Sequence, residues 1–429
     1  MQLIIQIVQL ISFLLFLNFY KQFAFKENCL HLSFFHFVYY FIFYYIGGAA
    51  MYAEGGYSNH KYIISVISYP LVALGGMFLA SQIKVIGKIN FLLRRSNLYI
   101  VYLFIFVISL LYLFSLESVP LLYVLKGDAL AAALSRSNAT KGFEGFKLVY
   151  YLFRVVVDYF LIYILILKYI DFDRFSKSFV AIFIISSIVC VIDTQKYPLI
   201  NLILIVLTTI YLRNQDNNRF KLKLSTLLSP KMALLVFLAY FVLGLLWSAI
   251  AGRLGERTSN EIFSSIFESA NSMMNDRLID GENRPLYAIY NMVPDKYDYF
   301  FGRTFPNPLR LMPFDPVPLS FLVFDEVHPN GEAVDGVLGA APTVFFSVIY
   351  ANFGIGFSFI SMFLFGFLVQ ILNDMLNGKG KYILPYRMVL INYIALFATS
   401  IDIPFLSEKV LSLLSLYFLM YKTFPANRR

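Results

Sequence analysis

The sequence predicts an all-α polytopic membrane protein, and two observations lead to that fold class. Hydrophobic residues make up 59% of the 429-residue chain and charged residues only 14%, whereas soluble domains carry roughly 45–50% and about 25%. The apolar residues recur in blocks of about 20, the length that a helix needs to cross a hydrocarbon layer. This composition excludes a soluble enzyme, a disordered chain and, with two cysteines, a disulfide scaffold.

Each apolar block is expected to form one transmembrane helix. The first block lacks a basic segment and a cleavage site, so it is expected to be a retained span and not a signal peptide. The ninth block is long enough for its helix to be tilted or broken. The eleven expected spans cover residues 1–20, 33–52, 61–80, 98–116, 147–169, 178–194, 197–212, 232–251, 342–372, 383–400 and 405–421.

Lysine and arginine gather in three connecting segments, which predicts that these segments face the cytoplasm. The first segment lies between the third and fourth spans and the second between the seventh and eighth, while the third is the tail YKTFPANRR. Eleven spans place all three on one side and the N-terminus on the other. The positive excess behind the net charge of +9 therefore lies on the cytoplasmic side, where it sets the topology and meets anionic lipid headgroups. Nothing in the sequence indicates nucleic acid binding.

Two loops on the outer side are too long to be simple connectors. They cover residues 117–146 and 252–341 of a chain that is expected to form a single integral membrane domain, residues 1–429. The longer loop carries thirteen acidic and seven basic residues, and a structureless loop of that length is unusual. We expect an interfacial amphipathic helix over residues 261–274 and then an irregular, proline-rich lid without regular helix. Function is expected in this loop.

The arginines and one lysine on the outer side are candidates for binding an anion, because the planar guanidinium matches diphosphate oxygens. Arg303 follows a glycine and precedes a turn, and Arg253 and Arg257 share one helix face. Lys196 lies at the outer end of two nearly continuous spans, beside Asp193. The alternative for each cation is snorkelling to the interface or pairing with nearby acids. Weaker candidates of the same kind are Arg257, Arg277, Arg284 and Arg310.

A proton acceptor is predicted near His328, because histidine titrates close to neutral pH. Glu326 and Asp335 lie nearby in sequence and could accept a proton instead. A solvated acidic turn is the alternative interpretation. In the fifth span, Arg154 and Asp158 are four residues apart, which predicts a structural ion pair or, alternatively, a proton or ion pathway.

Several short segments resemble, in sequence and in their order along the chain, the bacterial oligosaccharide repeat-unit polymerases, which are the O-antigen polymerases of the Wzy type. Three of them are GRTFPNP at residues 302–308, Pro342-Thr343 before a span, and YANFG at residues 350–354. An earlier span begins with the similar sequence QKYP at residues 195–198. The first outer loop has the order Pro120, Arg136 and Gly142-Phe143. The similarity covers patches between residues 120 and 356 and leaves out the first four spans.

The resemblance implies a metal-independent integral-membrane glycosyltransferase of the C type, without a cofactor. It would act at the periplasmic face of the bacterial inner membrane. There it would transfer a growing glycan from undecaprenyl diphosphate onto a newly flipped, lipid-linked repeat unit. Its partners would be the two lipid-linked oligosaccharides, membrane lipids, a chain-length regulator and a flippase. The choice of base does not follow from the resemblance, and the residues themselves offer His328, Asp335 and Glu326 for catalysis. The expected substrate-binding residues are Arg303, Arg253, Lys196, Arg136, Arg284, Arg257 and Tyr350.

Two alternative functions stay open. An O-antigen ligase of the same superfamily would pass the glycan to lipid A, although the GRTF and YANFG segments favour the polymerase. A transporter of polysaccharide or lipid-linked oligosaccharide would be expected to show inverted repeats and broken helices. The sequence shows no internal repeat, and only Arg154 and Asp158 favour this class.

Overall fold

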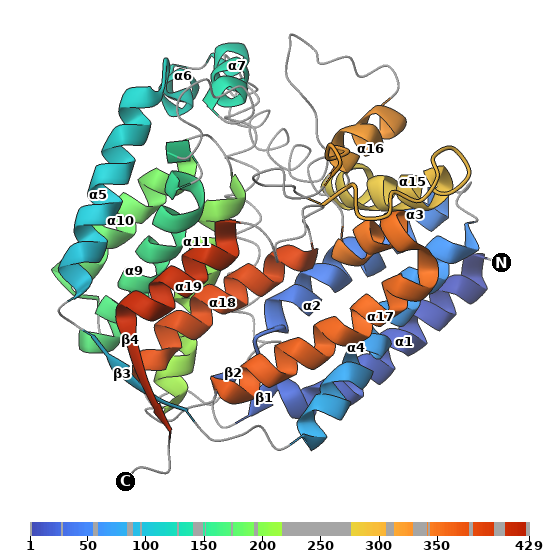
Figure 1. Ribbon diagram of the computed structural model, residues 1–429, viewed down its shortest axis with the longest axis horizontal. Helices are drawn as coiled ribbons and strands as arrows, with labels where there is room; N and C mark the ends of the chain where they lie inside the picture. Colours follow the sequence, from blue (N-terminus) through green and yellow to red (C-terminus); the bar gives the residue numbers. More distant parts are fainter. Residues whose placement is uncertain are drawn as a thin grey trace, which may run out of the picture. The chain divides into compact units, whose positions relative to one another are not determined.

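The computed structural model is almost entirely helical over the residues that it describes (Figure 1). These are residues 2–26, 29–54, 59–83, 89–94, 97–126, 128–139, 149–150, 152–172, 175–192, 196–216, 276–305, 313–328, 341, 344–376, 381–398 and 408–425. The chain divides into two compact units. The first unit comprises Met1–Val101, Leu278–Glu332 and Gly339–Arg429, and the second comprises Tyr102–Arg277 and Ala333–Leu338.

The described part of the chain contains five helices that are long and apolar enough to cross a membrane. They coincide with expected spans one to four and nine, which confirms an all-α protein of membrane character. Three shorter apolar helices coincide with expected spans six, seven and ten, while expected span eight lies outside the described residues. The five long helices are Leu3–Ala24, Phe34–Tyr52, His60–Gln82, Leu98–Ser115 and Phe345–Met375, and the shorter ones are Lys177–Val191, Asn201–Ile210 and Leu384–Ala398.

The first unit is built around long helices from both ends of the sequence. Its N-terminal part contains α1 (Gln2–Ala24), β1 (Phe25–Lys26), β2 (Cys29–Leu30), α2 (Phe34–Tyr40), the π-helix η1 (Phe41–Ile46), α3 (Gly47–Glu54), α4 (His60–Gln82) and β3 (Ile89–Leu93). Its later parts contain most of the π-helix η4 (Asp276–Asn283), then α15 (Arg284–Met292), α16 (Leu319–Val327), α17 (Phe345–Met375), η7 (Lys381–Ile383), α18 (Leu384–Ala395), η8 (Leu396–Ala398), α19 (Glu408–Met420) and β4 (Tyr421–Pro425).

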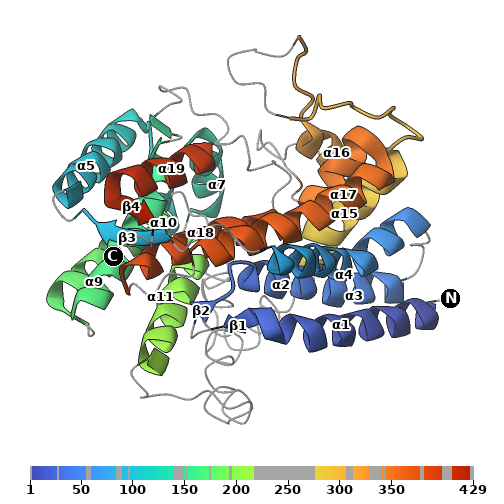
Figure 2. The same cartoon turned by 60° about the horizontal axis from the view of Figure 1, so that its bottom comes forward.

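The closest helix packing in the first unit joins α4 and α17, which lie side by side in Figures 1 and 2. Glycines make this approach possible. A Cβ atom on Gly366 would lie 1.8 Å from the carbonyl oxygen of Ala73, and one on Gly76 would lie 2.1 Å from that of Phe363. Small residues at helix crossings are the usual way to bring helices together in a membrane, where burial of apolar surface gives no driving force. The two helices therefore pack backbone to backbone at these glycines.

Hydrogen bonds connect different chain segments at each end of this bundle. At one end, which we call the loop end, Asn59 caps α4 and donates to the Tyr290 carbonyl (3.0 Å) and to the Asn291 side chain (2.7 Å). At the opposite end, the buried Arg387 donates to the Leu30 carbonyl (2.8 Å) and to Asn373 Oδ1 (3.0 Å). At each end, the bonds join chain segments that are far apart in sequence. Such contacts are expected where helices that run in alternating directions begin and end.

The loop between α4 and α5 and the end of the chain pair directly with each other. β3 and β4 form a two-stranded antiparallel sheet with Ile89 opposite Pro425 and Leu93 opposite Tyr421. Both strands belong to segments that were expected on the cytoplasmic side because of their basic residues. The pairing shows that these two segments lie together, while the side of the membrane stays a prediction.

The second unit has shorter helices around a buried one. Its core helix α9 is apolar and buried on all sides from Tyr159 to Leu167, which is typical of a helix enclosed by others, and α10 packs on α9 and α11. The described part of the first outer loop contains two short helices, and Ser118, just before the first of them, shares a hydrogen bond with Ser135 in the second (Oγ to Oγ, 2.7 Å). The elements are α5 (Leu98–Ser115), α6 (Pro120–Leu125), α7 (Ala129–Ala139), the π-helix η3 (Leu152–Val157), α9 (Asp158–Phe172), α10 (Lys177–Val191) and α11 (Lys196–Asp216).

One expectation about the long loop is wrong. The proline-rich segment was expected to contain no regular helix, but α16 occupies Leu319–Val327. The helix begins directly after Pro318, and its nine residues contain no proline. Proline is compatible with the beginning of a helix, because the first turn has no internal partner for its N–H groups. The prolines therefore set where α16 begins and do not exclude it.

Candidate functional site

The most distinctive local geometry of the first unit is a turn bound to a break in α17. The helix is interrupted at Gly354, whose φ of +82° and ψ of −177° lie outside the helical region. In an unbroken helix, the carbonyls of Ala351 and Asn352 accept bonds from residues four positions on. Here they accept from the backbone N–H groups of Phe300 and Phe301, each at 3.1 Å. The break thus gives a second segment a place to bind.

The side chain of Asn352 completes this attachment. Its Oδ1 accepts from the backbone N–H of Gly302 (2.7 Å) and, more weakly, from that of Thr304 (3.5 Å). Its Nδ2 donates to Thr304 Oγ1 and to the Val348 carbonyl (2.8 Å). Residues 300–305, which we call the Arg303 turn, are therefore held to α17 by both main chain and side chain. The GRTF and YANFG segments, almost 50 residues apart in sequence, form one structural unit.

Three tyrosines support the same junction. Tyr350 is fully buried, donates its hydroxyl hydrogen to the Val293 carbonyl (2.7 Å), and stacks on Tyr290 with ring centroids 4.1 Å apart. The ring of Tyr299 lies against Gly354, where an added Cβ atom would approach it to 3.3 Å. Tyr350 was predicted to bind substrate, and the structure places it in the packed interior next to α15. A substrate role for its side chain stays a prediction.

Arg303 itself is exposed, although its backbone is fixed. Its N–H donates to the Phe300 carbonyl (3.0 Å), and its carbonyl accepts from the N–H of Val317 (2.7 Å). Among the residues that the structure describes, no carboxylate forms an ion pair with its guanidinium. Arg303 therefore presents its full charge and its hydrogen-bond donors to solvent from a backbone held on two sides, a favourable arrangement for binding an anion.

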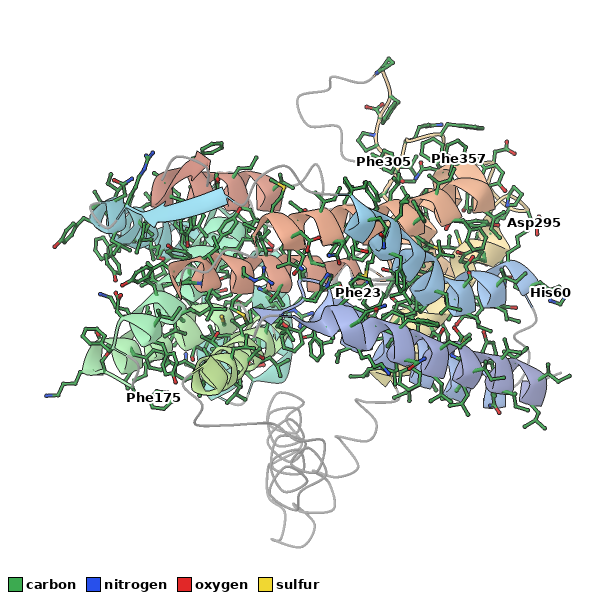
Figure 3. All side chains as sticks on the ribbon, turned by 90° about the horizontal axis from the view of Figure 1, so that it is seen from below. Phe23, His60, Phe175, Asp295, Phe305 and Phe357 are labelled. Atoms are coloured by element: carbon green, nitrogen blue, oxygen red, sulfur yellow. The ribbon has the colours of Figure 1, made fainter. Side chains whose placement is uncertain are left out.

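Aromatic rings flank the Arg303 turn on one side. Phe305 lies against Phe353 with centroids 6.0 Å apart, and Phe353 lies against Phe357 at 5.6 Å. Figure 3 shows Phe305 and Phe357 on the same side of the first unit, and Phe357 and Phe301 are 57% and 73% exposed. These rings would be compatible with lipid or with the membrane interface.

The candidate proton acceptors lie at the end of α16. His328 is exposed, and its ring lies 4.8 Å from that of Phe324. Glu326 is engaged by Lys296 through an ion pair at 2.5 Å, and the hydrogen bond to Glu326 raises the pKa of Lys296 above its ordinary value. The pair is exposed and contributes little to stability, but it occupies the Glu326 carboxylate. His328 is thus the more accessible base of the two.

The remaining predicted residues are distributed over both units or lie outside the described residues. Arg284 is half-buried at the first position of α15. Arg136 is exposed in α7, and Lys196 begins α11, both in the second unit. That Lys196 and Arg136 share one cavity with Arg303 stays a prediction, because they belong to a different unit. Arg253, Arg257, Arg310 and Asp335, the expected helix at 261–274, and the side chains of Arg154, Lys196 and Arg277 lie outside the described residues.

Sequence reasoning did not select Asn352, although a signal for it was present. Its position within an otherwise apolar block made it one of the few amides expected in a membrane span, where polar side chains require partners. Its main partners, Gly302 and Thr304, could not be inferred, since they lie almost 50 residues away and bind largely through their backbone groups. Among the described residues, no group of three or more His, Cys, Asp or Glu side chains could hold a metal ion.

Comparisons with protein-family models, with curated proteins and with solved structures found no match.

Proposed function

We propose that the protein is a polymerase of lipid-linked oligosaccharide repeat units in the bacterial inner membrane, with eleven spans and the loop end of the first unit facing the periplasm. It would transfer the growing glycan from undecaprenyl diphosphate to the sugar end of a new repeat unit. The proposal begins from the sequence resemblance. Its structural support is the contact between the two segments that carry most of that resemblance, residues 302–305 and 350–354.

The observation that carries the proposal is the exposed guanidinium of Arg303 on a fixed turn beside a candidate membrane helix. Glycosyl transfer from a lipid diphosphate produces a leaving group with increasing negative charge. A cation positioned before the reaction stabilises that charge without reorganisation. The attachment of the Arg303 turn to the break in a candidate membrane helix suits a diphosphate that is attached to a chain within the membrane.

The acceptor hydroxyl must lose a proton during transfer, and His328 is the proposed base. A general base near neutral pH needs an accessible acceptor atom. His328 meets this requirement, whereas Glu326 would first have to leave Lys296. His328 lies on the segment that follows α16, and α16 is connected to the Arg303 turn through the bond between Val317 and Arg303. A movement of α16 could therefore bring base and cation together around the substrates.

Substitution of Arg303 in a strain that lacks the chromosomal copy tests the proposal. Removing a contact to a developing anion lowers rates by roughly 10²–10³-fold, so Arg303→Ala should abolish long glycan at normal protein levels. Arg303→Lys should restore only part of it, because a point charge replaces a planar fork. Lys61→Ala is the matched control, since Lys61 is another exposed cation at the loop end. Near-normal chain length in Arg303→Ala would contradict the assignment.

The glycan pattern of the deletion strain separates the three candidate functions. Loss of a polymerase leaves lipid A capped with single repeat units, and loss of a ligase leaves no capping. Loss of a flippase causes lipid-linked units to accumulate on the cytoplasmic side. Only the first pattern agrees with the proposed function.

A further inference from the structure

Most of the hydrogen bonds of the Asn352 side chain lead out of α17. It is fully buried in a helix of apolar character, and a buried amide is costly unless it is hydrogen-bonded. Only one of its four side-chain bonds, to the Val348 carbonyl, is internal to the helix. The other three connect to the backbone of Gly302 and to the backbone and side chain of Thr304. These two residues are the immediate neighbours of Arg303.

The turn that these bonds hold would be unfavourable without them. Phe301 has a φ of +48° and Gly302 a φ of +88°. A positive φ is strained for a phenylalanine, and such a conformation persists only where the surroundings enforce it. Asn352 provides that constraint through its main-chain carbonyl, which binds Phe301, and through its side chain. The direction in which residue 303 leaves the turn depends on this geometry.

We infer that Asn352 is the positioning residue for Arg303: it fixes the backbone from which the guanidinium reaches an anion, without contacting that anion. The inference rests on the proposed function for the identity of the anion, a lipid diphosphate. Its geometric part, that Asn352 orders the Arg303 turn, stands independently. A misplacement of about 1 Å in a reacting geometry lowers rates by up to roughly 10²-fold, so the activity of Arg303 should depend strongly on Asn352.

A double-mutant cycle on polymerisation tests this dependence in proteoliposomes that contain purified protein and lipid-linked repeat units. Asn352→Ala alone should lower the rate by about 10–10²-fold. In the Arg303→Ala background the same change should have almost no further effect, because an absent guanidinium cannot be misplaced. A structural defect in α17 would instead multiply with the loss of Arg303.

Asn373 provides a matched control on the same helix. It is also a buried asparagine of α17, and its Oδ1 accepts from Arg387 at the opposite end of the bundle. Asn373→Ala removes an equivalent amide and should reduce protein stability. Its effect on the rate should multiply with that of Arg303→Ala. A cycle in which Asn352 behaves in the same way as Asn373 would overturn the inference.

A second measurement separates failure of the inference from failure of the proposed function. The chain has two cysteines, Cys29 and Cys190, so a cysteine-free background can carry Arg303→Cys with a nitroxide spin label. The label should be restricted when Asn352 is present and become mobile in Asn352→Ala, while Asn373→Ala leaves it unchanged.

The two readouts have distinct meanings. An unchanged label spectrum in Asn352→Ala would overturn the positioning role whatever the protein's activity is. A wild-type protein without polymerase activity, but with the expected change in label mobility, would refute the proposed function and retain the role of Asn352 in ordering the turn.

Discussion

Replacing Gly366 with alanine should separate α4 from α17, because the added methyl group would meet backbone and not a movable side chain. The Cβ atom would lie 1.8 Å from the Ala73 carbonyl oxygen, and real Cβ contacts are essentially never shorter than 3.0 Å. The helices must therefore move apart at this point by at least the difference between these distances, 1.2 Å, either by translation or by tilting. A gap of 0.5–1 Å between facing atoms already removes roughly a quarter to a half of the dispersion energy of each contact.

The expected loss follows from this separation. Overpacking of a well-packed core typically costs about 1–3 kcal/mol, and we expect the upper end, about 3 kcal/mol, because neither helix backbone can yield locally. No compensating hydrophobic term exists within a lipid layer. For a unit of this size, such a loss corresponds to a decrease of roughly 6–12 °C in the unfolding temperature.

Thermal unfolding of the detergent-purified protein, followed by size-exclusion chromatography after heating, measures the effect. Gly356→Ala is the control on the same helix, since nothing lies within 4 Å of its added Cβ atom. Gly75→Ala is the control on α4, because its Cβ atom would only touch the Phe363 ring at 4.0 Å, whereas Gly76→Ala should be as harmful as Gly366→Ala. Both controls should gain slightly from alanine's higher helix propensity. Equal unfolding temperatures for Gly366→Ala and Gly356→Ala would refute the close packing.

Two further predictions concern histidines. His328→Ala should lose polymer while lipid-linked repeat units still bind to the purified protein, and retained polymerisation together with loss in Glu326→Gln would transfer the role of base to the carboxylate. His31 lies between two spans, and burial lowers its pKa from 6.5 to about 3. Below pH 6.5 the unfolded state therefore binds more protons than the folded state, so the free energy of unfolding should decrease by about 1.4 kcal/mol per pH unit from about pH 6 downward. The unfolding temperature should fall between pH 7 and pH 5.5 more steeply in the wild type than in His31→Gln, and parallel curves would exclude His31 as the cause.

The sequence predicted the long spans well because one physical constraint determines them. A helix that crosses about 30 Å of hydrocarbon needs about 20 apolar residues, and composition alone shows such blocks. The sequence also allowed a break in α17 to be expected, since the ninth apolar block is longer than one span needs. The count of eleven spans rests on blocks for which the structure shows shorter helices or which lie outside the described residues.

The short α16 helix and the two compact units were not predictable in the same way. Leu319–Val327 has too few apolar residues to show a clear helical period. The five prolines before it therefore led to the expectation of no regular helix. The division into units depends on contacts between segments that are far apart in sequence, as with Arg387 and Leu30. Hydropathy contains no information about such pairs.

The candidate site was predicted in part, for a similar reason. The exposed cation at Arg303 could be selected from the sequence because glycine and arginine have individual chemical properties that predict a turn and an anion contact. Asn352 could not be assigned, because its importance lies in bonds to the backbone of Gly302 and Thr304. Backbone groups are present at every residue, and the one side-chain partner, the Thr304 hydroxyl, is too common a group to indicate Asn352.

The two halves of α17 perform different tasks, and the break at Gly354 separates them. The half after the break is held against α4 at Gly366, and the half before it holds the Arg303 turn through Asn352. A substitution at Gly366 should therefore lower the stability of the protein, and activity should fall only because less folded protein is present. A defect at Asn352 should lower activity at temperatures where the fold is intact. Because one helix joins both tasks, the packing of α17 sets where the Arg303 turn lies in the first unit, and the turn sets the direction in which Arg303 leaves it.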